Sequence, residues 1–141
     1  IEHIKTYTCI ITLHVVKRKN PKDVTKSAFY PSIALQTPVK RNSFYDDIAN
    51  ESTMTKHDLK AGVSALEAQL IKYLKEGYSV RLGDLGSFHL TCKSKGAATA
   101  DLVTAKNILR IHVKFTPSAQ METAMKVDSN PDVKFLMPSN K

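Results

Sequence analysis

Residues 75–90, Lys-Glu-Gly-Tyr-Ser-Val-Arg-Leu-Gly-Asp-Leu-Gly-Ser-Phe-His-Leu, constrain the fold more than any other part of the chain. Gly77 lies where a helix needs a residue with positive φ to close its last turn. Gly83 and Gly86 bracket a tight turn, because glycine reaches left-handed conformations without a steric penalty. We therefore expect the end of a helix, a short strand over 79–82, a hairpin turn and a second strand.

Two N-cap patterns predict two consecutive helices before this stretch. Ser43 and Asp46 predict a helix over about 43–52, and Thr55 and Asp58 repeat the pattern at the start of the next helix. Apolar residues recur in that second helix at steps of three and four: Leu59, Val63, Leu66, Leu70 and Leu74. One continuous apolar stripe is more typical of core or dimer packing than of a helix that reads a DNA groove.

The residues after the stretch predict a two-stranded arm. The chain loosens through 94–101 and returns as a strand from about Lys106. One side of that strand is apolar, with Leu109, Ile111, Val113 and Phe115, and the other carries Ile108, Arg110, His112 and Lys114. This alternation predicts a half-buried antiparallel strand with a basic exposed face. Thr116 as N-cap and Pro117 at the first helical position then predict a last helix.

The two ends of the chain give weaker signals. Residues 9–18 are rich in β-branched side chains and predict a strand, and 27–36 predict a second extended piece that Pro31 interrupts. Pro38 marks a boundary, and the residues beyond Val127 predict an irregular tail.

Positive charge is unevenly distributed along the 141 residues, whose formal net charge is +8. Residues 1–41 hold eight basic and two acidic side chains, residues 42–91 hold five and seven, and residues 92–141 hold eight and four. The beginning and the end of the chain are thus net positive, while the middle is slightly acidic. This pattern favours a polyanionic partner over an evenly solvated basic surface.

The stretch over 75–90 resembles the signature of the bacterial histone-like HU and integration host factor family. Residues 54–66 are similar to the start of the family's second helix, and residues 111–117, Ile-His-Val-Lys-Phe-Thr-Pro, are similar to the strand that returns from its DNA-binding arm. Residues 15–21 and 29–31 resemble a longer HU-like branch in which an additional N-terminal segment precedes the HU domain.

This resemblance implies an α+β fold in an intertwined, HU-like homodimer. Its parts are two N-terminal helices, a three-stranded antiparallel sheet with an extended β arm, and a C-terminal helix. We expect a basic, β-rich N-terminal extension over 1–41 that packs on the domain, an HU-like DNA-binding domain over 42–127 and an irregular tail over 128–141.

The function that the resemblance implies is non-enzymatic binding of double-stranded DNA, largely independent of sequence, in the bacterial nucleoid. Each cation that lies against a phosphate releases condensed counterions, so backbone contacts need no precise side-chain geometry. The candidate contact residues are Lys93, Lys95, Lys106, Arg110 and Lys114 on the arm, and Lys17, Arg18 and Lys19 in the extension. Base-specific readout is disfavoured, because the arm has a single arginine and no suitably placed Asn or Gln pair.

The chain departs from the family's pattern at the arm tip. HU-like arms carry an Arg-Asn-Pro tip whose proline wedges between base pairs, as described in general for these proteins. Here residues 96–100 read Gly-Ala-Ala-Thr-Ala, and Leu102 and Val103 are the apolar residues nearby. The family's lysines around the proline before the last helix are also replaced, by Thr116, Ser118 and Ala119. An alternative function is therefore a dimeric protein-interaction or scaffold module with little DNA affinity.

The sequence offers little for catalysis, cofactors or small-molecule substrates. The five histidines are scattered, and Cys9 and Cys92 have no metal-ligand spacing. The one candidate metal site is an adventitious one, if His89 and His112 meet across one hairpin. Residues 83–86 superficially match the GxxG loop of KH RNA-binding domains, but they join two strands rather than two helices. No apolar run approaches the ~20 residues that cross a bilayer, and no export signal is visible, so we expect a cytoplasmic protein.

Overall fold

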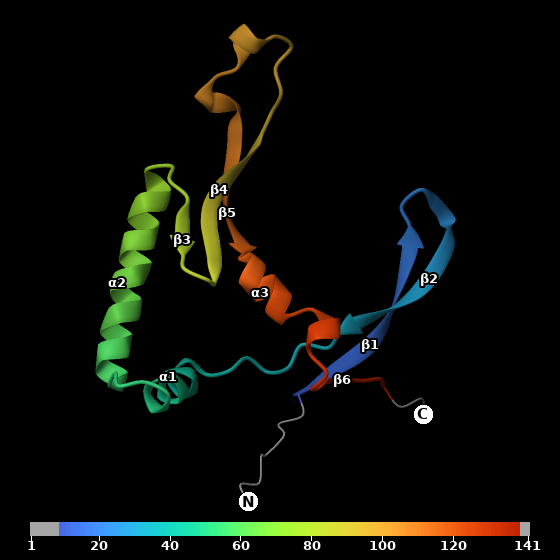
Figure 1. Ribbon diagram of the computed structural model, residues 1–141. Helices are drawn as coiled ribbons and strands as arrows, with labels where there is room; N and C mark the ends of the chain where they lie inside the picture. Colours follow the sequence, from blue (N-terminus) through green and yellow to red (C-terminus); the bar gives the residue numbers. More distant parts are fainter. Residues whose placement is uncertain (1–8, 139–141) are drawn as a thin grey trace, which may run out of the picture. The chain divides into compact units, whose positions relative to one another are not determined.

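The computed structural model describes residues 9–138, and the chain divides into two compact units. One unit joins the two ends of the chain, Ile1–Pro38 and Met125–Lys141, and the other comprises Val39–Ala124. Residues 1–8 of the predicted extension and 139–141 of the predicted tail lie outside the described residues. Both units contain a three-stranded sheet (Figure 1).

The first unit is built on a long β-hairpin. Strand β1 (Cys9–Asn20) pairs antiparallel with β2 (Asp23–Ile33), and its β-branched residues suit a pleated sheet. The side chain of Asn20 accepts a hydrogen bond from the backbone N–H of Lys22 at 2.9 Å, which orders the connecting turn. Strand β6 (Val133–Leu136) adds to the other side of β1 in parallel, giving the order β2-β1-β6.

Two expectations for this unit are wrong. Pro31 does not interrupt the second extended piece, because β2 is an edge strand, where a residue without an N–H costs no ladder hydrogen bond. The tail is not irregular throughout, since β6 follows a short 3-10 helix, η3 (Val127–Ser129), and pairs with β1. That pairing joins residues more than a hundred positions apart, and local sequence patterns do not report it.

The second unit combines α-helices and an antiparallel sheet, as the sequence predicts. Helices α1 (Arg41–Asn50) and α2 (Lys56–Lys75) precede the strands β3 (Val80–Leu82), β4 (Gly86–Ser94) and β5 (Ile108–Pro117), which lie in the order β3-β4-β5. Helix α2 runs beside the short β3, and the β4–β5 pair continues past the end of α2 as an arm (Figure 1). Helix α3 (Ala119–Ala124) follows β5.

The predicted capping of the main helix is confirmed. The Thr55 side chain accepts from the Asp58 N–H at 3.1 Å, and the Asp58 carboxylate accepts from the Thr55 hydroxyl at 2.6 Å. The other two helix starts differ from their predictions. Helix α1 begins at Arg41 after Lys40, which makes no side-chain cap, rather than at Ser43.

The last helix begins at Ala119 rather than after Thr116. Thr116 and Pro117 still belong to β5, where they pair with Ser87 and Gly86. Ser118 takes the capping role, because its hydroxyl accepts from the Met121 N–H at 3.0 Å. The ladder between β4 and β5 therefore extends two residues further than the N-cap pattern indicates.

Little apolar surface is buried within one chain. Among residues 9–138, the buried large apolar side chains are Tyr45, Leu59 and Leu74, with 7–9% of their surface exposed. Leu66 of the predicted α2 stripe is 44% exposed, and β5 is exposed along its whole length rather than half-buried. The apolar faces that the sequence assigns to a core thus remain largely uncovered in a single chain.

Gly77, Gly83 and Gly86 all adopt positive φ, as the sequence predicts. Gly86 has a φ of 149°, and a Cβ there would meet the backbone oxygen of Thr116 and lie 2.9 Å from the Phe115 ring. Gly86 thus lets β5 approach β4 closely at the base of the arm.

We predict that Gly86→Ala lowers the free energy of unfolding by at least about 2 kcal/mol, from backbone strain and steric overlap. Gly62→Ala is the matched control, because Gly62 lies inside α2 with no atom within 4 Å of an added Cβ. That change should stabilise the chain by about 0.5–1 kcal/mol, as alanine is the better helix former. Urea unfolding followed by circular dichroism measures both, and equal effects of the two substitutions would contradict the tight contact.

We predict a pH-dependent effect for Thr55→Ala. Hydrogen bonds from the Thr55 hydroxyl and N–H hold the pKa of Asp58 below its ordinary value of 3.8. A carboxyl whose pKa is lowered by folding stabilises the fold above 3.8 and loses that effect as the pH falls through its folded pKa. Thr55→Ala should therefore destabilise the protein at neutral pH, where it also removes the N-cap hydrogen bond to the Asp58 N–H, and should destabilise it less in acid. Urea titrations at both pH values, with exposed Thr53→Ala as control, test this; a pH-independent difference would contradict it.

Candidate nucleic-acid interface

The candidate interface is the arm that β4 and β5 form. Their register pairs Phe88 with Phe115 near the base and Lys93 with Arg110 near the far end, where one irregularity interrupts the ladder between Lys93 and Ser94. Directly opposed residues in an antiparallel pair project from the same face, and successive residues alternate between the two faces. The arm therefore has two chemically different faces.

The first face is polar and basic. Its cross-strand pairs are His89 with Lys114, Thr91 with His112, and Lys93 with Arg110. Like charges placed directly opposite each other destabilise a strand pair. The Lys93–Arg110 pair is thus a position where an external anion would relieve repulsion.

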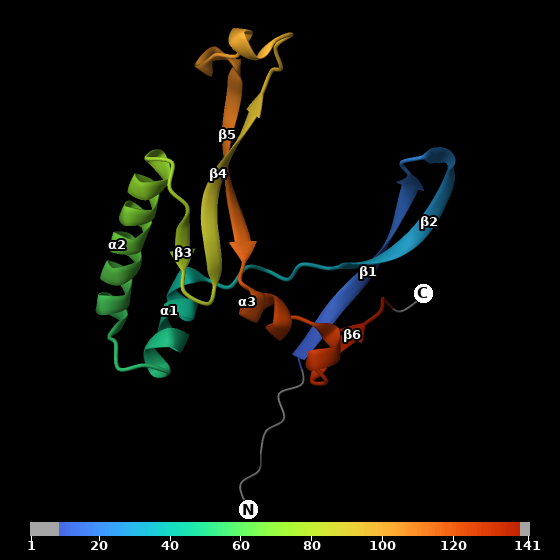
Figure 2. The same ribbon diagram turned by 45° about the horizontal axis from the view of Figure 1, so that its top comes forward.

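The tip of the arm is ordered by local hydrogen bonds. The Lys95 N–H donates to the Asn107 carbonyl at 2.8 Å, and the Asn107 side-chain amide donates back to the Lys95 carbonyl at 3.1 Å. Two short 3-10 helices, η1 (Ala100–Leu102) and η2 (Ala105–Asn107), lie in the chain that joins the two strands (Figure 2). Lys93, Arg110 and Lys114 lie on the two strands, whereas Lys95 follows β4 and Lys106 lies in η2, so these two cations belong to the tip.

The arm cations are not neutralised within the described part of the chain. The ion pairs found there are Lys56 with Asp46 at 2.8 Å and Lys26 with Asp23 at 3.7 Å, and neither involves the arm. Asp101 is the one acidic residue between Gly86 and Pro117. The arm therefore presents an excess of positive charge to solvent.

The second face of the arm is apolar. Phe88, Leu90 and Cys92 lie opposite Phe115, Val113 and Ile111, and the two phenylalanine ring centroids are 5.0 Å apart. Ile111 is 61% and Val113 is 60% exposed. Together with Leu90 and the α2 residues Ile71, Leu74 and Lys75, these two side chains line an apolar groove. A single chain leaves this groove open.

Lys17, Arg18 and Lys19 lie on β1 and belong to the other unit, so the structure does not join them to the arm in one compact body. Lys17 is directly opposite Phe29 on β2, with its Nζ 5.6 Å from the ring centroid. Lys22 and Lys26 extend this basic cluster. These two residues were not predicted from the sequence because the two strands were treated separately, and a prediction of one hairpin over both would have included them.

The register gives His89 and His112 different partners, Lys114 and Thr91, so the two histidines are diagonal neighbours rather than a facing pair. Over residues 9–138, no group of three or more His, Cys, Asp or Glu side chains is arranged to hold a metal ion. Cys9 and Cys92 are both free and exposed. Within the same residues, no helix has the length and apolar character that crossing a membrane requires.

The helix pair, the three-stranded sheet and the projecting two-stranded arm define an HU-like domain. The chain belongs to the HU-HIG family, described as an HU domain fused to a winged helix-turn-helix, an Ig or a glycine-rich motif, whose profile matches residues 11–130. The match includes most of the β1–β2 hairpin as well as the arm.

One solved structure shows the same fold at low sequence identity. It is a protein from Bacteroides vulgatus ATCC 8482, described as a candidate bacterial DNA-binding protein, with a TM-score of 0.59 and 15% identity. The alignment covers 92% of the present chain but 48% of that protein's chain, so the present chain spans about half the length of its structural relative. A comparison with curated proteins gives no significant match.

Proposed function

We propose that the protein binds double-stranded DNA through the basic face of its β4–β5 arm, without enzymatic activity and largely without regard to sequence. The observation that carries the proposal is the Lys93–Arg110 pair, in which two cations face each other with no acidic neighbour on the strands. Phosphates satisfy such a pair, because they supply the missing negative charge at a regular spacing. His112 and Lys114 continue the same face towards the base of the arm.

Family membership supports this proposal, and the name of the Bacteroides relative agrees with it. A non-enzymatic DNA binder of this kind would act in DNA condensation and nucleoid architecture in the cytoplasm. Strong bending by a proline wedge is not expected, because the tip lacks proline. Leu102 and Val103 are the exposed apolar residues there, at 61% and 58%.

We further propose that the DNA-binding form is a homodimer. Apolar side chains of α2 and of the apolar face of the arm are more than 40% exposed: Leu66, Ile71, Ile111 and Val113. Burial of apolar surface contributes about 25 cal/mol per Å², so a second copy that covers these residues would supply the core that one chain lacks. The basic face points away from this apolar face, so dimerisation would leave the cations free for DNA.

The alternative is a dimeric interaction module that keeps the fold and has little DNA affinity. The same exposed apolar face and the absence of a tip proline favour it. The two functions differ in one measurable property, which is salt-dependent binding to duplex DNA.

We predict that the double variant Lys93→Gln/Arg110→Gln binds duplex DNA more weakly, by the same factor on unrelated sequences. Each lost phosphate contact should reduce the slope of log affinity against log salt by about 0.9, and a dimer would lose contacts on both arms. Fluorescence anisotropy with labelled duplexes at several salt concentrations measures both quantities.

The matched control is Lys60→Gln/Lys72→Gln, which removes the same charge from α2. We expect it to change the salt slope much less than the arm variant does. If the wild-type protein fails to bind any duplex at low salt, the proposed function is wrong and the interaction module is favoured.

We predict that Val113→Lys converts the dimer to monomer and lowers the midpoint of thermal unfolding, because it places a charge on the apolar face. His112→Lys, at the neighbouring position on the basic face, should leave the dimer intact. Sedimentation velocity gives the oligomeric state, and circular dichroism verifies that each variant is folded. A wild-type chain that sediments as a monomer at the concentrations of the DNA assay contradicts the proposed dimer.

A further inference from the structure

The end of the β1–β2 hairpin carries a second cluster of positive charge. Residues 17–26 include five basic side chains, Lys17, Arg18, Lys19, Lys22 and Lys26, and one acidic side chain, Asp23. The Asp23 carboxylate accepts hydrogen bonds from the hydroxyl and the N–H of Thr25, so it is engaged within the turn. Its ion pair with Lys26 is long, at 3.7 Å, and solvent-exposed. The cluster therefore keeps most of its charge for an external anion.

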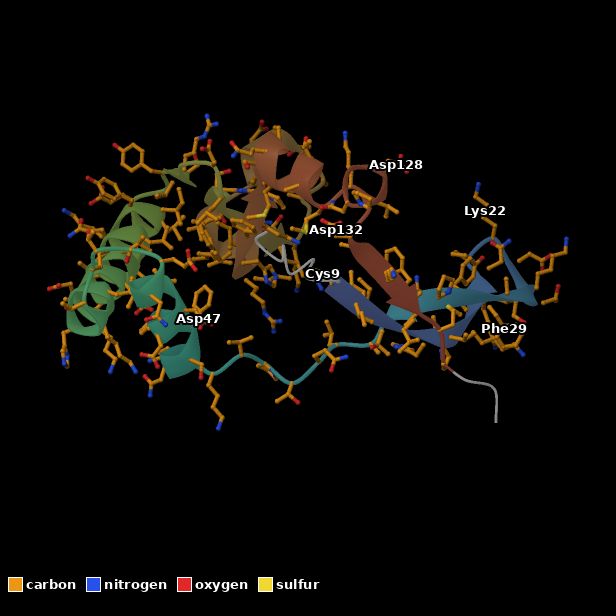
Figure 3. The ribbon with its side chains drawn as sticks, turned by 60° about the horizontal axis from the view of Figure 1, so that its bottom comes forward. Cys9, Lys22, Phe29, Asp47, Asp128 and Asp132 are labelled. Atoms are coloured by element: carbon orange, nitrogen blue, oxygen red, sulfur yellow. The ribbon has the colours of Figure 1, made fainter. Side chains whose placement is uncertain are left out.

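An exposed aromatic ring lies within this cluster. Phe29 is 69% exposed, directly opposite Lys17, whose Nζ lies 5.6 Å from the ring centroid. Lys19 shares the same face of the hairpin two residues along β1, where it pairs with Ser27. Figure 3 shows Lys22 at the end of the hairpin and Phe29 on its strands, both directed away from the ribbon.

Tyr30 gives the opposite face of the hairpin a similar composition. It is 48% exposed and pairs with Val16, next to the position where Arg18 faces Ala28. Each face thus has an exposed aromatic ring with a basic side chain beside it, Lys17 next to Phe29 and Arg18 next to Tyr30. A burial role is not visible for either ring within the described part of this unit.

An aromatic ring with flanking cations fits a base and its neighbouring phosphates. Bases stack on exposed aromatic side chains with little sequence preference, while lysine and arginine track the backbone. In a duplex the base faces are already stacked on one another, so a ring such as Phe29 would first have to unstack a base step, whereas an unpaired base is accessible without that cost. The combination therefore selects an unpaired strand.

We propose that the β1–β2 hairpin is a second nucleic-acid site, which binds a single-stranded polynucleotide by stacking a base on Phe29 beside Lys17 and Lys19. The site lies in a different compact unit from the arm, and it goes beyond the duplex binding proposed above. A second copy of the hairpin is the less favourable occupant, because five cations on each copy repel one another.

The test uses the full chain with a short labelled oligothymidylate and a matching oligouridylate, whose comparison tells whether the strand is DNA or RNA. Phe29→Leu keeps an apolar side chain but removes the ring, and we expect about a tenfold loss of affinity for the preferred oligonucleotide. Phe44→Leu is the matched control, since Phe44 is 55% exposed on α1, outside the cluster. It should bind like the wild type.

Two further measurements separate this site from the arm. Lys17→Gln/Lys19→Gln should flatten the salt dependence of oligonucleotide binding, whereas Lys93→Gln/Arg110→Gln should affect duplex binding instead. Photo-crosslinking with an iodouracil-substituted oligonucleotide, followed by peptide mass spectrometry, should place the crosslink at Phe29.

Unchanged oligonucleotide affinity in Phe29→Leu, or crosslinks confined to the arm, would overturn the second site and leave duplex binding by the arm untouched. Self-association of the wild type that Phe29→Leu abolishes would also overturn it, in favour of a hairpin-to-hairpin contact. Conversely, loss of duplex binding in the arm variant with oligonucleotide binding intact would support two separate sites.

Discussion

The register of the β4–β5 ladder is the constraint on which the rest of the second unit depends. With Phe88 opposite Phe115 and Lys93 opposite Arg110, the apolar pairs between Phe88 and Cys92 project from one face of the arm, and Lys93, Arg110 and Lys114 project from the other. A slip of one residue would bring charge onto the apolar face along the whole arm. Gly86 helps to hold this register, because only a residue without a Cβ allows the carbonyl of Thr116 to approach so closely. One backbone position at the base of the arm thus helps to keep the cations of the two strands on one face.

The same ladder links assembly to binding. One chain leaves Ile111 and Val113 about three-fifths exposed, although their positions in a strand opposite Leu90 and Cys92 are typical of a core. A partner that covers this face contributes stability and at the same time orients the opposite face outwards. The proposals for a dimer and for DNA binding are therefore linked. The dimer uses the apolar face of the β4–β5 ladder, and DNA binding uses its basic face.

Sequence patterns predicted the features that depend on interactions between residues close together in the chain. The positive-φ glycines, the Thr55–Asp58 capping box and the antiparallel pairing of β5 depend on neighbouring residues, and the structure confirms each, although β5 is exposed rather than half-buried. The start of α1 was missed because no side chain caps it, and β6 was missed because its partner β1 lies at the other end of the chain. The candidate arm residues could be grouped from sequence, but their facing partners could not, since these depend on the register and on the irregularity after Lys93.

Cross-strand partners also explain why we propose different ligands for two basic segments of similar composition. Lys93 faces Arg110, so the far end of the arm offers charge alone, which matches the outside of a duplex. Lys17 faces Phe29, so the hairpin offers positive charge beside an aromatic ring, which suits an unpaired base and its phosphate. Net charge cannot distinguish these cases, because both segments are simply basic. The distinction arises only when the strands pair, and it is a property of the fold rather than of either strand by itself.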